Sequence, residues 1–464
     1  MKRKLLSTIF VLFLFTSVLT AQKEHNIWYF GHQAGLDFNS GTPVALTDGM
    51  MSQLEGCASI SSPNGTLLFY TNGVNVWDNS HNIMPNGDSL GGGSSSTQSA
   101  LIVPFPGNNL LYYIFTSADG QNNFKIFDYS IVDMSLNNGK GDIITKNNVL
   151  FSPVNEKLTA VKHSNGVDVW VMSHEFNTNS FIMYLITSAG ISPAPLISSI
   201  GTYVYFIGYM KFSPDGSKIA LAGNSVGGGP TQLFDFNPST GMIANDKVLT
   251  LPPNSACYGL EFSPSGNYLY GSISHFDTLL NGSTFSIYQW DITSNNDSLI
   301  NASRQEIYGP SYSLYLGALQ LGPDGKIYAA LDLQVFLGVI NNPDLPGVLC
   351  NFDTNAVSLN GKLSLLGLPN FITSYFLPTT IKENTEHQNQ ISVFPNPAST
   401  LLTIQSPSKT ANTTVILHNT LGEQLLTKQF KEKTTIDIRN FPPGIYFVTI
   451  SNDEYRVTKK VVKQ

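Results

Sequence analysis

A strand, a tight turn that ends in glycine, and a second strand recur six times between residues 58 and 329. The clearest turns are residues 212–216 (FSPDG) and 262–266 (FSPSG). Proline presets the first position of such a turn, and glycine accepts the positive φ that closes the hairpin. The turn glycines are Gly65, Gly107, Gly166, Gly216, Gly266 and Gly325, spaced 42 to 59 residues apart. A period near 50 with several short strands per unit predicts an all-β fold, a β-propeller.

The two ends of this body predict how the ring of blades closes. Residues 27–30, 35–38 and 44–46 have the pattern of the second, third and fourth strands of a blade whose first strand is missing. Residues 371–376 (FITSYF) are left over after the sixth repeat, and we expect them to supply that strand. Closure would remove the open sheet edges. Residues 22–378 then favour seven blades, with six or eight as alternatives because the longest gaps could hide extra strands.

The C-terminal residues, 391–464, predict a separate small module. Short alternating apolar runs are divided by Pro and Gly turns, as in a small Ig-like β-sandwich. This segment has nine Lys and Arg against five Asp and Glu, whereas the whole chain has a net charge of −7. Residues 379–390 contain few apolar side chains and indicate a linker.

The motifs of this module, taken together, have a specific resemblance. Residues 393–398 read VFPNPA, residues 443–448 read PGIYFV, and the chain closes on the basic strand RVTKKVV at 456–462. The segment resembles the type A C-terminal sorting domain of the Bacteroidetes type IX secretion system. The resemblance implies recognition by that secretion machinery, passage across the outer membrane, and release or attachment at the cell surface. An accessory Ig-like domain is the alternative.

The body has two weaker resemblances. The FSPDG-type turns resemble WD40-like or TolB-type propeller repeats. Residues 28–31 (WYFG), 55–60 (EGCASI) and 95–99 (SSTQS) resemble stretches of a group of uncharacterised Bacteroidetes surface proteins. That group brings no assigned substrate or catalytic residue.

The N-terminus agrees with export. Residues 2–4 (KRK) are basic, residues 5–19 are apolar, and Thr20 and Ala21 are small, as in a cleaved signal peptide over residues 1–21. No later apolar run reaches the length of a transmembrane helix, so we expect no transmembrane span in the mature chain, which would be secreted or lie at the outer cell surface by way of the periplasm. The acidic body argues against nucleic acid as a partner.

No motif for catalysis, metal or cofactor stands out. His174-Glu175 lacks the second His of a zinc protease, no Gly-x-Ser-x-Gly is present, and residues 91–96 (GGGSSS) lack the lysine of a phosphate-binding loop. We therefore expect no enzyme activity, metal or cofactor. Cys57, Cys257 and Cys350 are too sparse for a disulfide framework, and we expect buried thiols, with one Cys57–Cys257 or Cys257–Cys350 bridge as the alternative.

Propeller geometry gives one candidate site. First strands line the central channel, and the loops that lead into them form one face of the disc, the funnel. Eight to ten residues before five of the turn glycines stand polar or aromatic side chains: Glu55, Gln98, Glu156, Tyr258 and Tyr315. Carboxylates and tyrosines that converge on a funnel could bind a sugar or peptide. The alternative is that they only cap and pack the blades.

The sequence therefore favours a non-enzymatic exported propeller that binds glycan or protein. The alternatives are a polysaccharide hydrolase or lyase with paired funnel carboxylates, and a structural scaffold of a surface or gliding apparatus with a plugged channel. Three Asp-Ser/Thr-Leu tripeptides also resemble O-glycosylation acceptors of Bacteroidetes and fall in loop-like sequence, with Ser89, Thr278 and Ser298 as the acceptors.

Overall fold

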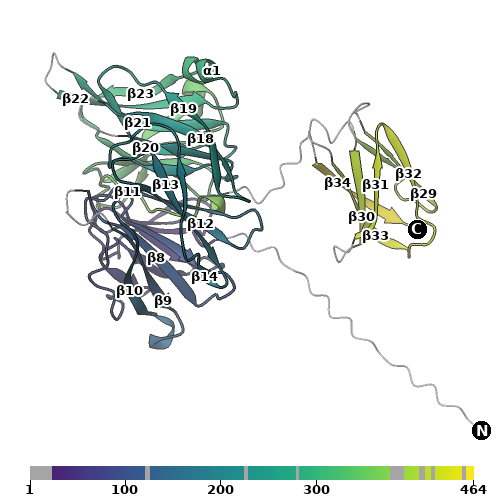
Figure 1. Ribbon diagram of the computed structural model, residues 1–464, viewed down its shortest axis with the longest axis horizontal. Coiled ribbons are helices and arrows are strands. Elements are labelled where there is room, and N and C mark those ends of the chain that lie inside the picture. Colours follow the sequence, from purple (N-terminus) through teal and green to yellow (C-terminus); the bar gives the residue numbers. More distant parts are fainter. Residues whose placement is uncertain are drawn as a thin grey trace, which may run out of the picture. The chain divides into compact units, whose positions relative to one another are not determined.

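Antiparallel sheets make up nearly all of the regular secondary structure that the computed structural model describes (Figure 1). The structure describes residues 23–120, 126–223, 228–277, 282–376, 391–406, 413–419, 424–451 and 456–464. The expected signal peptide, the expected linker and Thr278 lie outside these residues. The chain divides into two units, residues 1–377 and 378–464.

Seven sheets form in the described residues of the first unit. The first three contain β1 (Ile27–Phe30), β2 (Ala34–Asp37) and β3 (Val44–Leu46); β4 (Ala58–Ser61), β5 (Leu67–Thr71) and β6 (Val76–Asp78); and β7 (Ala100–Pro104), β8 (Leu111–Ser117), β9 (Phe127–Asp133) and β10 (Asp142–Phe151). The fourth contains β11 (Val154–Lys162), β12 (Val169–Glu175) and β13 (Ser180–Thr187), with β14 (Gly190–Ile191) and β15 (Leu196–Ser199) both paired to β13.

The last three sheets of this unit have four strands each. They contain β16 (Met210–Phe212), β17 (Lys218–Leu221), β18 (Thr231–Asn237) and β19 (Met242–Leu249); β20 (Ser255–Phe262), β21 (Tyr268–Asp277), β22 (Gly282–Asp291) and β23 (Gln305–Ser311); and β24 (Leu316–Leu321), β25 (Ile327–Leu331), β26 (Phe336–Ile340) and β27 (Phe352–Ser358). Short helices connect some strands: η1 (Asn137–Gly139), α1 (Asp297–Ala302), η2 (Gly347–Cys350) and η3 (Thr373–Phe376).

The six predicted hairpins are confirmed. Each is the first strand pair of its sheet: β4–β5, β7–β8, β11–β12, β16–β17, β20–β21 and β24–β25. All six turn glycines have φ between 71° and 88°, a region that L side chains avoid. The repeated glycines therefore meet a backbone requirement of the turn.

The first strands of successive sheets contact one another in the order β1, β4, β7, β11, β16, β20 and β24. The ring closes between the first and last sheets, where the Trp28 and Tyr328 rings lie 5.4 Å apart. A set of antiparallel sheets whose first strands follow one another around a closed ring is a β-propeller. We call these first strands the inner strands.

The expected strand at residues 371–376 is wrong. Thr373–Phe376 forms the helix η3, and residues 363–372 make only single bridges, at Leu363 to His32, Pro369 to Cys57 and Ile372 to Ala160. The apolar residues there are Phe371, Ile372, Tyr375 and Phe376, a spacing of four that fits a helix better than the alternation of a strand. Three of these rings surround His25, with centroids 4.6 to 6.3 Å from it.

Residues 363–376, here called the channel segment, instead run between the inner strands of several sheets. Leu366 N donates to Leu54 O at 2.9 Å and Leu366 O accepts from Ala318 N at 2.8 Å. Asn370 N donates to Cys57 O at 2.8 Å. A Cβ on Gly367 would lie 1.7 Å from Glu55 O, so only glycine allows this approach. The segment thus ties the last sheet to the second.

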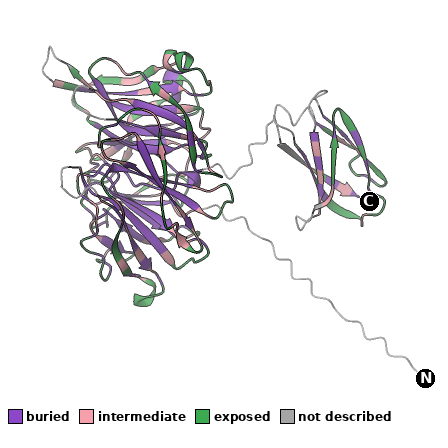
Figure 2. Ribbon diagram, viewed as in Figure 1, coloured by how far each residue is buried: buried purple, intermediate pink, exposed green. Residues whose placement is uncertain are grey.

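Burial runs through the sheets of the first unit, with exposure at the outer strands and loops (Figure 2). Strands β4, β20 and β24 are buried at every residue. Cys57, Cys257 and Cys350 are buried free thiols, so neither alternative disulfide forms. No helix among the described residues has both the length and the apolar character needed to span a membrane.

The second unit is an Ig-like sandwich of seven strands, as predicted. One sheet contains β28 (Ser392–Phe394), β29 (Leu401–Gln405) and β32 (Lys433–Asp437), and the other contains β31 (Gln424–Phe430), β30 (Thr413–His418), β33 (Gly444–Ser451) and β34 (Arg456–Lys463). Alternate residues of both sheets, such as Leu402, Ile404, Val415 and Leu417, form its core.

Candidate functional site

The five residues expected at the funnel all lie at the leading ends of inner strands. Glu55 precedes β4, Gln98 precedes β7, Glu156 and Tyr258 lie early in β11 and β20, and Tyr315 precedes β24. Because these strands follow one another around the ring, their leading ends gather on one face. The structure thus brings the five residues to one region, but it gives them different surroundings.

The side chains of Gln98 and Glu156 make hydrogen bonds to other parts of the protein. Gln98 is fully buried; its Oε1 accepts from Met210 N at 2.8 Å and its Nε2 donates to Met210 O at 3.1 Å. Glu156 Oε2 accepts from the Thr97 backbone and hydroxyl at 3.0 and 2.7 Å, and Oε1 accepts from Gly120 N at 2.7 Å. Gln98 therefore ties the third sheet to the fifth and Glu156 ties the fourth to the third, which is the alternative we gave for the funnel residues.

Lys157 is a buried cation that the sequence analysis missed. Its Nζ lies 2.9 to 3.4 Å from the carbonyl oxygens of Tyr205, Phe206, Ile207 and Gly208. Burial lowers the pKa of the Lys157 ammonium to about 7, and the neighbouring Glu156 opposes this shift. The sequence did contain a signal for this buried cation, namely a lysine within the apolar run of an inner strand. Its partners are backbone atoms of a loop about 50 residues later, which no side-chain pattern reveals.

A second buried ionic group joins the fifth, sixth and seventh sheets. Lys211 Nζ lies 3.2 Å from Glu261 Oε2 and 2.5 Å from Gln320 Oε1. Glu261 also accepts from Leu321 N at 3.0 Å. Each of these side chains is at least 97% buried, and their polar atoms are paired, so they are structural ties.

Glu55 and Tyr258 differ from these ties. Each is only 7% exposed, and Glu55 Oε2 and Tyr258 Oη make no hydrogen bond of ordinary geometry within the described chain. The two groups nevertheless interact through a loose side-chain hydrogen bond, and Ser95 makes a second such contact with Glu55. Burial, and after it the negative charge of Glu156, raise the pKa of the Glu55 carboxyl to about 8. At neutral pH this carboxyl is therefore largely protonated and can donate a hydrogen bond.

Tyr315 supplies an exposed aromatic surface beside this pair. It is 46% exposed, and its ring centroid lies 4.1 Å from that of Phe285. After burial, the charge of Glu55 helps to raise the pKa of the Tyr315 hydroxyl. Glu55, Tyr258 and Tyr315 are here called the funnel site. Aromatic rings beside polar groups are suited to bind a sugar ring or a peptide.

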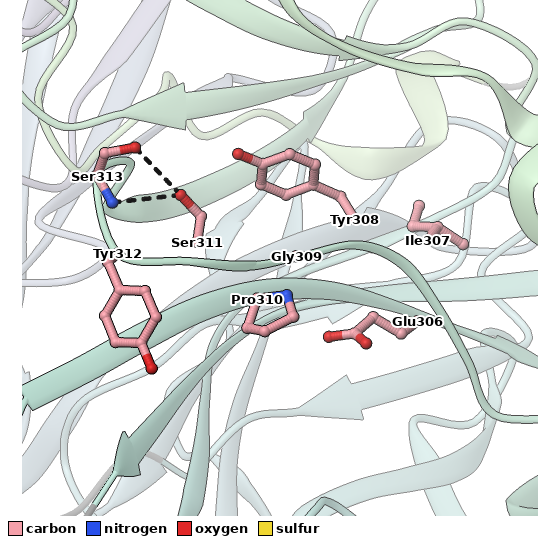
Figure 3. Close-up of a pocket in the computed structure, with 8 residues that line it drawn as sticks. All are labelled: Glu306, Ile307, Tyr308, Gly309, Pro310, Ser311, Tyr312 and Ser313. Carbon is pink, nitrogen blue, oxygen red and sulfur yellow. Dashed lines mark hydrogen bonds between the residues drawn. The ribbon is translucent and has the colours of Figure 1, made fainter. Parts of the chain in front are cut away.

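A groove on the outer strand of the sixth sheet was not anticipated. It has a volume of about 680 Å³ and is lined by Glu306, Ile307, Tyr308, Gly309, Pro310, Ser311, Tyr312 and Ser313. Figure 3 shows Tyr308 and Tyr312 on opposite sides of this strand, with Ser311 bonded to Ser313. Tyr312 is 59% exposed. The sequence offered no repeat position for this groove because the strand lies outside the hairpin motif.

The residues that the structure describes contain no cluster of three or more His, Cys, Asp or Glu side chains that could hold a metal ion.

Of the three expected modification sites, Ser89 lies in an exposed loop with φ of 54°. Ser298 lies in the helix α1, contrary to the loop that we expected. Asn296 caps that helix by accepting from Leu299 N at 3.1 Å, a cap that explains why an Asn-Asp-Ser sequence is helical here.

Comparison with known proteins addresses the two units separately. Residues 392–464 match the family described as the secretion system C-terminal sorting domain. No curated protein matches the chain.

Solved structures resemble the chain at low identity. A Bacteroides uniformis protein provisionally assigned as a 6-phosphogluconolactonase is 13% identical, with 89% of this chain and 100% of that one covered and a TM-score of 0.38. The Dos1 propeller is 12% identical over 72% and 79%, with a TM-score of 0.41. A puromycin hydrolase is 10% identical over 74% and 55%, with a TM-score of 0.40. These likenesses concern the fold alone.

The sheet topology and the family match together define a class: a β-propeller fused to a C-terminal sorting domain. The sorting domain makes the chain a type IX secretion substrate, handled by that machinery and delivered to the cell surface or the extracellular space.

Proposed function

We propose that this exported β-propeller binds a glycan or protein ligand at its funnel site and does not alter it chemically. The observation that supports this proposal is the pair Glu55 and Tyr258: Glu55 Oε2 and Tyr258 Oη are buried without a well-formed hydrogen bond among the described residues and interact only loosely with each other. A buried polar group without a hydrogen bond costs about 1–3 kcal/mol, and a ligand group would offset that cost. Tyr315 next to them offers a surface for stacking.

The test is an array of glycans, host polysaccharides and proteins, probed with the full exported chain and followed by product analysis of every positive well. Binding without cleavage supports the proposal. Cleavage would favour the polysaccharide hydrolase or lyase instead.

Two substitutions assign the binding to the funnel site. Tyr315→Ala and Glu55→Gln are expected to weaken binding at least tenfold. Tyr268→Ala is the matched control, because Tyr268 begins β21 just after the Gly266 turn, at the opposite end of the sheets. Equal loss in all three variants, or none in any, would contradict a ligand at the funnel site.

The channel segment favours a second candidate, a structural scaffold. Residues 363–376 lie between the inner strands, so the channel itself is occupied. A scaffold would give no positive well on the array and would be recovered with a surface assembly after cross-linking.

The export signal and the modification sites belong to the same proposal. We place signal cleavage after Ala21, the end of the propeller near residue 378 and the linker at 379–390. N-terminal sequencing of the exported protein tests the first. Intact mass tests whether hexose is added at Ser89, Thr278 or Ser298.

A further inference from the structure

Leu333 holds a large apolar side chain in solvent at a backbone position that suits glycine. It lies in the turn between β25 and β26, which the bond from Gln334 N to Leu331 O closes at 3.2 Å. Its φ is 58° and its side chain is 64% exposed. Glycine or asparagine is favoured at such a turn position, because most side chains crowd the backbone there. Packing within the chain therefore does not explain a leucine at this place.

Exposed apolar side chains continue on both sides of Leu333. Asp332 N donates to Tyr315 O at 3.0 Å, so the turn lies directly beside the loop that carries Tyr315. On the other side, Gln334 O accepts from Ser364 N at 2.8 Å, and Leu366 N, two residues later, donates to Leu54 O at 2.9 Å. Five exposed side chains lie along this path, here called the apolar arc: Tyr312, Tyr315, Leu333, Val335 and Leu54.

The composition of the apolar arc favours a polypeptide over a sugar as its ligand. Leu54, Leu333 and Val335 are aliphatic and offer no polar atom to the hydroxyl groups of a sugar. An exposed apolar surface of several side chains is typical of a protein interface, whose core is poor in charged residues and rich in aromatic ones. The arc runs from the sixth sheet over the seventh to the loop before the second, a path that suits an extended segment of chain.

One carboxylate in the arc indicates what else that segment carries. Asp332 is partly exposed, and its Oδ1 makes no hydrogen bond of ordinary geometry. The Leu333 N–H makes a loose hydrogen bond to this carboxylate, and no Lys, Arg or His among the described residues forms an ion pair with it. An arginine suits this place, because its planar guanidinium can pair with a carboxylate and lie on an aromatic ring such as that of Tyr315.

We infer that the apolar arc binds an extended segment of another protein in which an arginine stands between apolar side chains. The apolar side chains of the segment pack on Leu333 and its neighbours, and the guanidinium pairs with Asp332. This inference rests on the proposed function, because Tyr315 belongs to both surfaces, and it narrows the ligand from glycan or protein to protein.

Selection from a random linear peptide library tests this inference, with the full exported chain as the bait. We expect the enriched peptides to share an arginine flanked by apolar residues. A synthetic peptide from this set is then titrated with the chain, and fluorescence anisotropy measures its affinity. Replacement of the peptide's arginine with glutamine should weaken binding about tenfold.

Leu333→Asn is the decisive variant. Asparagine accepts the positive φ of this turn, so the fold should keep its stability while the apolar contact is lost. Peptide binding should fall about tenfold or more. Val167→Asn is the matched control and should leave binding unchanged, because Val167 is 60% exposed and follows the Gly166 turn at the opposite end of the sheets.

A second variant separates the charge from the apolar contact. Asp332→Asn should weaken the arginine peptide about fivefold and leave the glutamine peptide unchanged, since only the first has a guanidinium to pair. Equal effects on both peptides would contradict the pairing of arginine with Asp332.

The remaining outcomes distinguish the inference from the proposed function. Absence of any enriched peptide, or equal peptide binding by the wild type and Leu333→Asn, would overturn the inference. A positive glycan array that depends on Tyr315 would in that case leave the proposed function standing. A dimer that forms at high concentration and dissociates in Leu333→Asn would overturn the inference in favour of a second copy of this chain. Silence of both the peptide library and the whole array would overturn the proposed function as well.

Discussion

Asn370 Nδ2 donates a hydrogen bond of 2.7 Å to Leu158 O, which joins the channel segment to the inner strand of the fourth sheet. The same nitrogen lies 3.4 Å from Ala100 O in the third sheet. One amide, 2% exposed, thus connects the end of the propeller to two strands more than 200 residues earlier in the chain. The channel segment is part of the core.

Asn370→Ala should lower the free energy of unfolding by about 2 kcal/mol, because two buried carbonyl groups lose their donor. Urea denaturation measures this. Asn355→Ala, at an exposed position in β27, is the control and should stay within about 0.5 kcal/mol. An unchanged midpoint for Asn370→Ala would mean that the channel segment does not hold the ring.

Removal of the whole channel segment tests the same idea more strongly. A chain that ends at Lys362 loses the backbone hydrogen bonds that Leu363, Leu366 and Asn370 make to the first, second and last sheets. Without these bonds the chain should fail to unfold cooperatively. A chain that ends at Leu377 keeps them and should melt like the full propeller unit. Limited proteolysis and circular dichroism distinguish the two. Equal stability of both chains would show that the sheets close without the segment.

Lys157→Met should destabilise the propeller by about 3 kcal/mol. The substitution fills similar space but leaves four carbonyl oxygens without their donor and Glu156 without its neighbouring cation. Lys146→Met is the matched control, since the surface ion pair of Lys146 with Asp88 should contribute less than about 1 kcal/mol. Equilibrium denaturation of both variants measures the difference, and equal effects would contradict a structural role for the carbonyl contacts.

Stability should depend on pH through Glu55. The folded pKa of about 8 lies above the usual value of 4.5, so the folded protein binds more protons than the unfolded chain between these values. The stability that protonated Glu55 contributes is complete below about pH 4.5 and is lost as pH rises through 8. Relative to Glu55→Gln, the wild type should lose about 4 kcal/mol between pH 5 and pH 9. Denaturation series at both pH values measure this, and parallel curves for the two proteins would refute the raised pKa.

Local patterns in the sequence were sufficient for the elements and much of the architecture. The six turn glycines predicted six hairpins because a tight turn needs positive φ at a fixed place, which is a local requirement. The alternating runs around Leu402 and Val415 predicted the sandwich in the same way. The regular spacing of the hairpins then placed Glu55, Gln98, Glu156, Tyr258 and Tyr315 at equivalent ends of inner strands.

Tertiary structure decided what those side chains do. Gln98 and Glu156 bond to backbone atoms of other sheets, and Lys157 bonds to a loop about 50 residues later. Glu55 is buried, and its only side-chain contacts of this kind are loose ones with Tyr258 and Ser95 in the described chain. Residues 371–376 are as apolar as a strand, yet Thr373–Phe376 forms a short helix, and the rings of Phe371, Tyr375 and Phe376 pack around His25. The sequence by itself determined the repeat, the turns and the sorting domain, since these depend on neighbours in the chain. The partners of buried polar groups depend on which strands the closed ring brings together, and that is settled only by folding.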